Sequence, residues 1–151
     1  MKILVINGPN LNFLGIRDKN VYGDESYETL VSRIKQKCSQ TGTEIECYQS
    51  NHEGAIIDRI QAAYSDGTDG IVINPGAYTH YSYAIHDALK SVESIVKAEV
   101  HISDIDTREE FRKNSVTAPA CDFFIKGHGF AGYEEAVDLI INRLENKGGI
   151  V

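Results

Sequence analysis

Two residues with the chemistry of a general acid lie close together in the run Glu99-Val100-His101. The surrounding pattern predicts a strand, and on a strand residues i and i+2 point to the same face. Glu99 can then accept a hydrogen bond from one imidazole nitrogen of His101 and fix the other nitrogen toward a ligand. The spacing predicts an oriented general acid. It also leaves open a satisfied histidine at a strand end, with Glu99 in a surface ion pair.

A second run, RDKNVYG at 17–23, places Arg17 five residues before Tyr22. A tyrosine acts as a base only as its phenolate, and a cation about 4 Å away stabilises an anion by about 4 kcal/mol at an effective dielectric constant near 20. Arg17 could supply that cation, and Arg112, in REEFR at 108–112, a second one. Spacing alone leaves open the alternative of a solvated loop with an aromatic anchor.

A third run, GIVINPGAYTH at 70–80, reads as a buried strand that ends in a turn carrying Asn74 and His80. The turn contains neither G-x-x-x-x-G-K-[ST] nor G-x-G-x-x-G, the patterns of loops that cradle phosphate groups. Gly127-His128-Gly129 lacks them as well and is predicted to be a plain turn. Asn74 and His80 are therefore candidates for holding a ligand of another kind.

Strand-like and helical segments alternate along the chain and must position these side chains. The strand-like segments lie at about residues 2–7, 43–49, 69–74, 94–101 and 121–126. Helical spacing of apolar residues is found at about 26–41, after Glu53, at about 79–91 and at about 132–146. The patterns S-x-x-E at 50–53 and T-x-x-E at 107–110 predict capping boxes, the second at the start of a short helix.

Five strands alternating with helices predict an α/β fold, a three-layer sandwich with a parallel sheet covered on both faces. The flavodoxin-like strand order 2-1-3-4-5 is favoured, and it places the ligand crevice beyond the carboxyl ends of strands 1 and 3. An unpatterned stretch of about 17 residues follows strand 1 and reaches the same edge of the sheet. We therefore expect the three runs to meet there.

Composition limits the classes of protein that fit. With 151 residues, the chain is predicted to form a single catalytic domain, residues 1–151. A net charge of -7 argues against a nucleic-acid or anionic-membrane surface. Apolar runs are too short for a membrane span, and MKILVINGPN lacks a secretory signal, which predicts a cytoplasmic protein. Cys38, Cys47 and Cys121 are widely spaced and suit neither a disulfide framework nor a zinc site.

The runs taken together resemble the type II 3-dehydroquinate dehydratases. The motifs that carry the resemblance, in chain order, are NGPNLNFLG at 7–15, Arg17 with Tyr22-Gly23, QSNHEG at 49–54, INPGAYTH at 73–80, EVHISDI at 99–105, REEFR at 108–112 and Gly132-Tyr133. The resemblance covers nearly the whole chain. It implies dehydration of 3-dehydroquinate to 3-dehydroshikimate in the shikimate pathway, without metal, cofactor or Schiff base.

The resemblance also implies roles for individual residues. Tyr22, activated by Arg17 and Arg112, would abstract the proton next to the ketone in an anti elimination through an enolate. Asn12 and an ordered water would stabilise that enolate. His101, held by Glu99, would protonate the departing hydroxyl. Substrate contacts would come from the side chains of Asn74, His80 and Arg112 and the backbone N–H groups of Ile102 and Ser103.

Family members assemble as trimers stacked into dodecamers, and their tyrosine and arginine loop behaves as a lid. Gly15 and Gly23 flank the corresponding loop here and are candidate hinges, and Asp87 matches an acidic residue that reaches a neighbouring active site. The chain departs from the family at YSYAIHD, 81–87, where T-S-V-A-L-R-D is usual. His86 is assigned a structural role here, as are His52 and His128.

Other functions that suit the same fold fail at particular positions. A phosphoacceptor receiver needs paired acids after strand 1 and an aspartate ending strand 3, where this chain has Asn7-Gly8-Pro9 and Asn74. A flavin carrier needs a loop rich in Ser and Thr after strand 1, which is also missing. An inactive relative kept for assembly is disfavoured because the set Arg17, Tyr22, His101 and Arg112 is intact.

Overall fold

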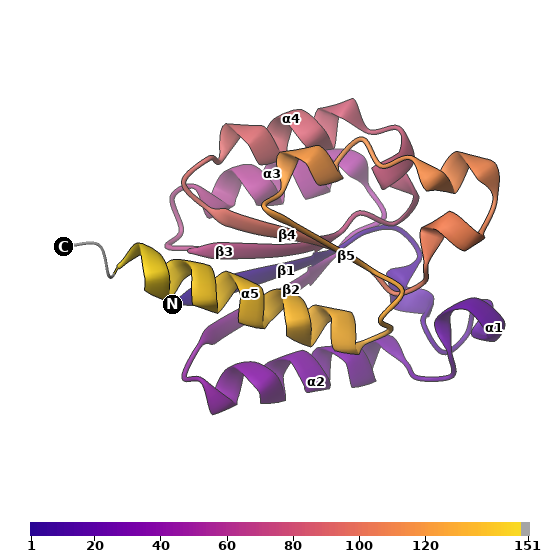
Figure 1. Cartoon of the computed structure of the whole chain (residues 1–151), viewed down its shortest axis with the longest axis horizontal. Helices are drawn as coiled ribbons and strands as arrows, with labels where there is room; N and C mark the ends of the chain where they lie inside the picture. The colour runs from indigo at the N-terminus through magenta and orange to yellow at the C-terminus, as the bar shows by residue number, and fades with distance from the viewer. Residues whose placement is uncertain (149–151) are drawn as a thin grey trace.

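The computed structural model describes residues 1–148 and shows a central parallel sheet between two layers of helices (Figure 1). The strands are β1 (Lys2–Asn7), β2 (Glu44–Gln49), β3 (Gly70–Asn74), β4 (Val96–His101) and β5 (Phe123–Lys126). Every neighbouring pair is parallel, and the strand order is β2-β1-β3-β4-β5. The predicted flavodoxin-like fold and strand order are confirmed.

Two helices cover each face of the sheet. On one face lie α2 (Tyr27–Gln40) and α5 (Ala131–Lys147), and on the other lie α3 (Glu53–Ala63) and α4 (Tyr83–Ser91) (Figure 1). A further short helix, α1 (Lys19–Tyr22), stands apart from these layers near the carboxyl ends of the strands. Among residues 1–148, no helix is both long and apolar enough to cross a membrane.

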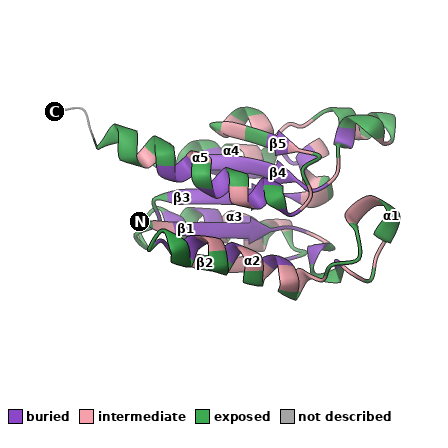
Figure 2. Cartoon of the chain, turned by 60° about the horizontal axis from the view of Figure 1, so that its bottom comes forward, coloured by how far each residue is buried: buried purple, intermediate pink, exposed green. Residues whose placement is uncertain are grey.

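Alternating side chains of the strands divide the core into two clusters. Ile3 and Val5 of β1 pack with residues of α2 and α5, whereas Leu4 and Ile6 pack with residues of α3 and α4. Successive side chains on a strand point to opposite faces, so a strand covered on both sides needs a continuous apolar run. Figure 2 shows the resulting burial in the strands and on the inner faces of the helices.

Both predicted capping boxes are wrong, because other polar contacts occupy the side chains concerned. Ser50 Oγ accepts a hydrogen bond from the backbone N–H of His52 at 3.0 Å, and α3 begins only after His52. Thr107 ends a 3₁₀ helix, Ile105–Thr107, and donates its hydroxyl to the backbone oxygen of Asp104 at 2.8 Å. The short helix expected from Thr107 is therefore replaced by this turn and a second 3₁₀ helix, Glu110–Lys113.

Gly8 brings the chain leaving β1 against the chain leaving β3. Its backbone N–H donates to the Asn74 carbonyl at 2.8 Å, and a Cβ at this position would lie 2.6 Å from the Pro75 carbonyl oxygen. Only a residue without a side chain fits this approach. The close contact holds the turn that carries Asn74 at the carboxyl edge of the sheet.

We expect Gly8→Ala to lower the free energy of unfolding by about 1–3 kcal/mol, the usual cost of forcing backbone apart in a packed region. Urea denaturation measures it. Gly54→Ala is the matched control, because a Cβ at Gly54 would meet nothing within 4 Å and Ala suits a helix better than Gly. Equal unfolding midpoints for the two variants would contradict the prediction.

Candidate active site

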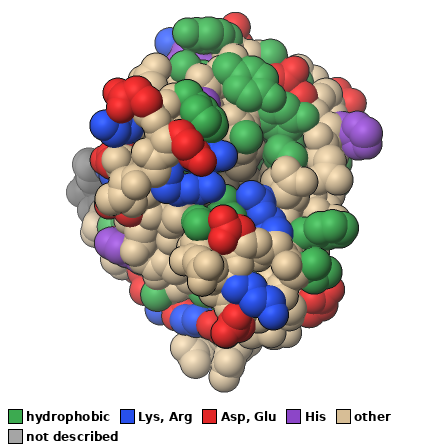
Figure 3. All heavy atoms as spheres, turned by 90° about the vertical axis from the view of Figure 1, so that its right-hand side faces the viewer, with side chains coloured by type: hydrophobic (Ala, Val, Ile, Leu, Met, Phe, Trp, Pro, Cys, Tyr) green, Lys and Arg blue, Asp and Glu red, His purple; other side chains and the backbone are tan. Residues whose placement is uncertain are grey.

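A pocket of about 130 Å³ lies at the carboxyl edge of the sheet. Its lining comes from the segments that follow β1, β3 and β4 and from α1: Pro9, Asn10, Leu11, Arg17, Tyr22, Asn74, Gly76, Ala77, His80, His101, Ile102, Ser103, Ile105, Arg108 and Arg112. Figure 3 shows this end of the molecule, where basic side chains gather near the middle of the face. Three arginines thus line a pocket in a protein whose net charge is -7.

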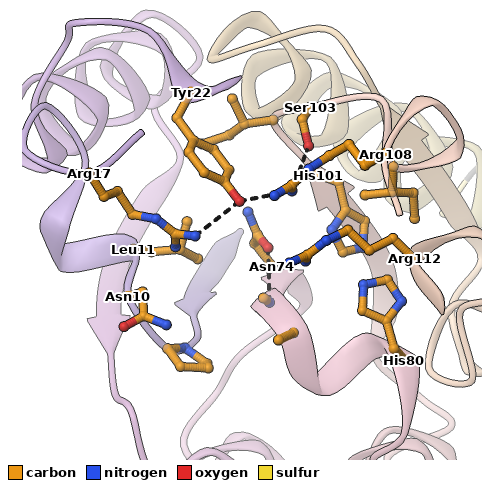
Figure 4. Close-up of a pocket in the computed structure, with 15 residues that line it drawn as sticks. Asn10, Leu11, Arg17, Tyr22, Asn74, His80, His101, Ser103, Arg108 and Arg112 are labelled. Carbon is orange, nitrogen blue, oxygen red and sulfur yellow. Dashed lines mark hydrogen bonds between the residues drawn. The ribbon is translucent and has the colours of Figure 1, made fainter. Parts of the chain in front are cut away.

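The hydroxyl oxygen of Tyr22 lies between two guanidinium groups (Figure 4). Arg17 Nη2 donates to it at 3.1 Å and Arg108 Nη1 at 2.9 Å. The Arg17 guanidinium also lies 4.3 Å from the centre of the tyrosine ring. Two cations on one phenol oxygen stabilise its ionised form, so the geometry suits a base.

Arg108 is the second arginine on Tyr22, and the prediction that Arg112 fills this role is wrong. A helix from Thr107 would have placed Arg108 and Arg112 on one face, at i and i+4. The chain forms 3₁₀ turns instead, so Arg108 reaches Tyr22 while Arg112 Nε pairs with the Glu109 carboxylate and still lines the pocket. Apart from its charge, nothing in the sequence around Arg108 indicates that it contacts Tyr22.

The predicted pairing of His101 with Glu99 is confirmed. His101 Nε2 lies 2.7 Å from Glu99 Oε1, and the two side chains are 6% and 0% exposed. An ionised carboxylate only accepts hydrogen bonds, so Nε2 carries the proton and Nδ1 is left for a group in the pocket. The geometry therefore favours the oriented acid over a surface ion pair.

Three hydroxyl groups complete the surroundings of the Glu99 carboxylate. Thr79 Oγ1 lies 2.5 Å and Ser115 Oγ 3.1 Å from Oε1, and Thr117 Oγ1 lies 2.6 Å from Oε2. A buried charge is tolerated where its lone pairs are used in this way. These contacts hold the carboxylate, and with it the His101 ring, in one orientation.

His80 is oriented by a backbone group. Its Nδ1 lies 2.9 Å from the Asn114 carbonyl oxygen, which can only accept, so Nδ1 carries the proton and neutral His80 keeps Nε2 as an acceptor. Burial lowers the pKa of His80 below its usual value, and His101 and Arg112 act in the same direction, whereas the hydrogen bond to Asn114 and the Glu99 charge oppose the shift. The neutral form is thereby favoured.

This lowered pKa predicts a loss of stability in acid. Between the folded-state pKa and about 6.5 the unfolded chain binds more protons than the folded one. The stability due to neutral His80 is therefore complete above about pH 6.5 and declines as the pH falls below it. Urea denaturation at about pH 7.5 and pH 5.5 should show a larger loss for the wild type than for His80→Gln. Equal losses in the two proteins would contradict this.

Three predicted site residues lie outside the pocket lining. Asn12 is exposed, and its Oδ1 accepts from Gln49 Nε2 at 3.4 Å, while Asn10 lines the pocket instead. Asp87, on α4, has a side chain that is 81% exposed, and its Oδ1 lies 3.2 Å from Nδ1 of the neighbouring His86. The other predicted side chains line the pocket, except Glu99, which lies behind His101.

The histidines predicted to be structural make local contacts. His52 precedes the first residue of α3, His86 Nδ1 meets Asp87, and His128 Nδ1 lies 2.7 Å from Glu135 Oε2. The three cysteines are free thiols, and Cys38 is fully buried. None of these six residues lines the pocket.

Comparison with known proteins agrees with the observed fold. The chain matches the family model described as dehydroquinase class II over residues 1–141. A 3-dehydroquinate dehydratase from Lachnoclostridium phytofermentans is 63% identical over 142 residues, which are 94% of this chain and 97% of that protein. One from Lachnospira eligens is 59% identical over 142 residues, with the same shares of the two chains.

A solved structure gives the same result in three dimensions. The type II dehydroquinase from Butyrivibrio crossotus superposes with a TM-score of 0.93 at 67% sequence identity, covering 93% of this chain and 97% of that one. The similarity includes the strands and turns whose carboxyl ends form the pocket, since the family match runs from residue 1 to residue 141. This chain belongs to the class II dehydroquinase family.

Proposed function

We propose that this protein removes water from 3-dehydroquinate to give 3-dehydroshikimate, as a hydro-lyase of the shikimate pathway. The observation that carries the proposal is the pairing of two proton-transfer groups in one pocket: a phenol held by two arginines and an imidazole held by a buried carboxylate. The names of the similar proteins, which are 3-dehydroquinate dehydratases, supply the substrate.

Tyr22 is the general base of the proposed reaction. As the phenolate, stabilised by Arg17 and Arg108, it takes the proton from the carbon next to the ketone, and the electron pair of the broken C–H bond forms an enolate. The Asn12 amide lies outside the pocket lining, so its proposed role in stabilising the enolate requires a bridging water.

His101 is the general acid. The C–O bond to the departing hydroxyl breaks as the enolate collapses, and the hydroxyl leaves as water with the proton from Nδ1 of the imidazolium. Nε2 keeps its proton throughout, because it is bonded to the Glu99 carboxylate, which also stabilises the cation before the transfer. The proposed elimination is anti and passes through no imine.

The substrate carboxylate is proposed to lie on the backbone N–H groups of Ile102 and Ser103 beside the Asn74 amide. Both residues line the pocket, and within residues 1–148 neither N–H donates to a backbone carbonyl. His80 and Arg112 are placed to hold the substrate hydroxyls. A few convergent donors of this kind let an acidic protein bind an anion.

We extend the proposal to assembly and loop closure. Trimers stacked into a dodecamer would let the exposed Asp87 carboxylate reach a neighbouring pocket. Gly15 and Gly23, with φ of 85° and 82°, flank the segment that carries Arg17 and Tyr22 and are suited to act as its hinges. The mass in solution tests the assembly, and a monomer would exclude the role of Asp87.

The test of the function is to mix the purified protein with 3-dehydroquinate and follow the ultraviolet absorbance of the conjugated product. No signal would overturn the proposal. Tyr22→Phe protein, prepared in the same way, controls for a contaminating enzyme. Borohydride added with substrate is expected to leave the activity intact, because the proposed route forms no imine, and rapid inactivation would contradict that route.

A further inference from the structure

A chain of three buried polar side chains runs beneath the pocket. Asn7 ends β1, Asn74 ends β3, and Tyr133 lies in the first turn of α5, with exposures of 0%, 3% and 0%. The Tyr133 hydroxyl lies 2.7 Å from Asn7 Oδ1, and Asn74 Nδ2 lies 2.9 Å from the Tyr133 oxygen. Of the three, only Asn74 lines the pocket, and Figure 4 shows its amide among the other lining residues.

The backbone N–H of Gly76 fixes the direction of the hydrogen bonds that link Asn74, Tyr133 and Asn7. The N–H of Gly76 can only donate, and it lies 3.1 Å from Asn74 Oδ1. The Asn74 oxygen must therefore face Gly76, and its nitrogen must face Tyr133. Tyr133 then accepts from Asn74 and has its own proton left for Asn7 Oδ1. A flipped Asn74 amide would place its nitrogen against the Gly76 N–H, so that two donors would face each other.

We propose that Tyr133 is a positioning residue, which holds the Asn74 amide so that a nitrogen-bound hydrogen, and not the oxygen, is offered to the substrate carboxylate. The inference rests on the proposed function, which supplies that carboxylate. The Asn74 nitrogen has two hydrogens; Tyr133 uses one, and the other remains for the pocket. A flipped amide would turn its oxygen toward an anion and repel it.

The free-energy cost of burying three polar side chains suggests that they have a role besides packing. Burying polar groups costs free energy unless each is hydrogen-bonded, and the Tyr133 hydroxyl is a partner of both Asn7 Oδ1 and Asn74 Nδ2. Phenylalanine at 133 would fill nearly the same volume but would leave Asn7 Oδ1 and Asn74 Nδ2 without the hydrogen bonds that the Tyr133 hydroxyl provides. Burial also raises the pKa of Tyr133, so the hydroxyl keeps its proton, and its donor to Asn7, across the working pH range.

A kinetic double-mutant cycle tests the proposal. Tyr133→Phe is expected to raise KM for 3-dehydroquinate about tenfold and to change kcat less than about threefold, since a ground-state contact is lost. In the Asn74→Ala background the same substitution should change KM less than about twofold. A tenfold effect in both backgrounds, or no effect in either, would overturn the positioning role. Tyr48→Phe, in the other core cluster, is the control and should leave KM unchanged.

A measurement that needs no turnover keeps the inference separate from the proposed function. The side-chain NH₂ signals of Asn74, assigned by their loss in Asn74→Ala, should exchange with deuterium at least about tenfold faster in Tyr133→Phe than in the wild type. Equal exchange would overturn the proposal, even if the protein proved inactive on 3-dehydroquinate. Should Tyr133→Phe fail to fold, Asn7→Ala takes its place, because it removes the acceptor of the Tyr133 proton. Its effect on KM should likewise disappear in the Asn74→Ala background.

Discussion

Replacing Tyr22 by phenylalanine is expected to lower kcat by about a thousandfold, within the range of about 10²–10⁴ that a positioned base contributes. The ring remains and can still lie against Arg17, but the oxygen that Arg17 and Arg108 hold is gone. Substrate contacts on the strand ends are untouched, so KM should change little. Initial rates of product absorbance across a range of substrate concentrations separate the two constants.

The arginines provide an internal comparison for this result. Arg108→Ala should lower kcat because it removes a donor to the Tyr22 oxygen, whereas Arg112→Ala should act mainly on KM. Tyr64→Phe, at an exposed site, is the matched control and should behave as wild type. A Tyr22→Phe enzyme that kept more than about a tenth of kcat would show that the base lies elsewhere.

His101→Ala is expected to lower kcat by about 10²–10⁴, because the hydroxyl would then leave without a proton donor. The buried Glu99 carboxylate would also lose the partner at 2.7 Å, while its contacts with Thr79 and Thr117 remain. Added imidazole should restore part of kcat by entering the vacated space, and circular dichroism should confirm that the variant is folded.

The exposed His128 gives the control for this substitution. It pairs with Glu135 outside the pocket, so His128→Ala should leave kcat unchanged. The proposed acid step would be refuted if His101→Ala retained wild-type kcat, or if its activity fell but imidazole and other small acids had no effect on a correctly folded protein.

The strands were predictable because their signal is local and strong. The apolar run of β1 or β3 is buried on both faces, and a parallel sheet at the centre of three layers follows from such runs alternating with helices. The capping boxes failed for the opposite reason. A hydroxyl such as that of Ser50 or Thr107 can bond several nearby backbone groups with similar energies, so the surrounding turn decides its partner.

The site was predictable wherever a functional side chain lies at or near a strand end. Glu99, His101 and Asn74 belong to regular strands, so their direction follows from the period of two. Arg108 lies among 3₁₀ turns, which no periodic sequence pattern predicts. Tyr133 meets Asn74 across a separation of 59 residues, and only packing of α5 on the sheet brings the two together.

The low burial of the short helix α1 bears on the timing of the proposed reaction. None of its four residues is buried, whereas His101 and Glu99 belong to a strand buried along its whole length. Segments with little buried surface open locally at a free energy far below that of global unfolding. In the proposed mechanism, the base Tyr22 would therefore be free to leave and return in each turnover while the acid His101 stays in place. The two arginines on Tyr22 come from different segments, Arg17 from its own loop and Arg108 from beyond β4, so under this proposal the loop must close before Tyr22 can act as the base.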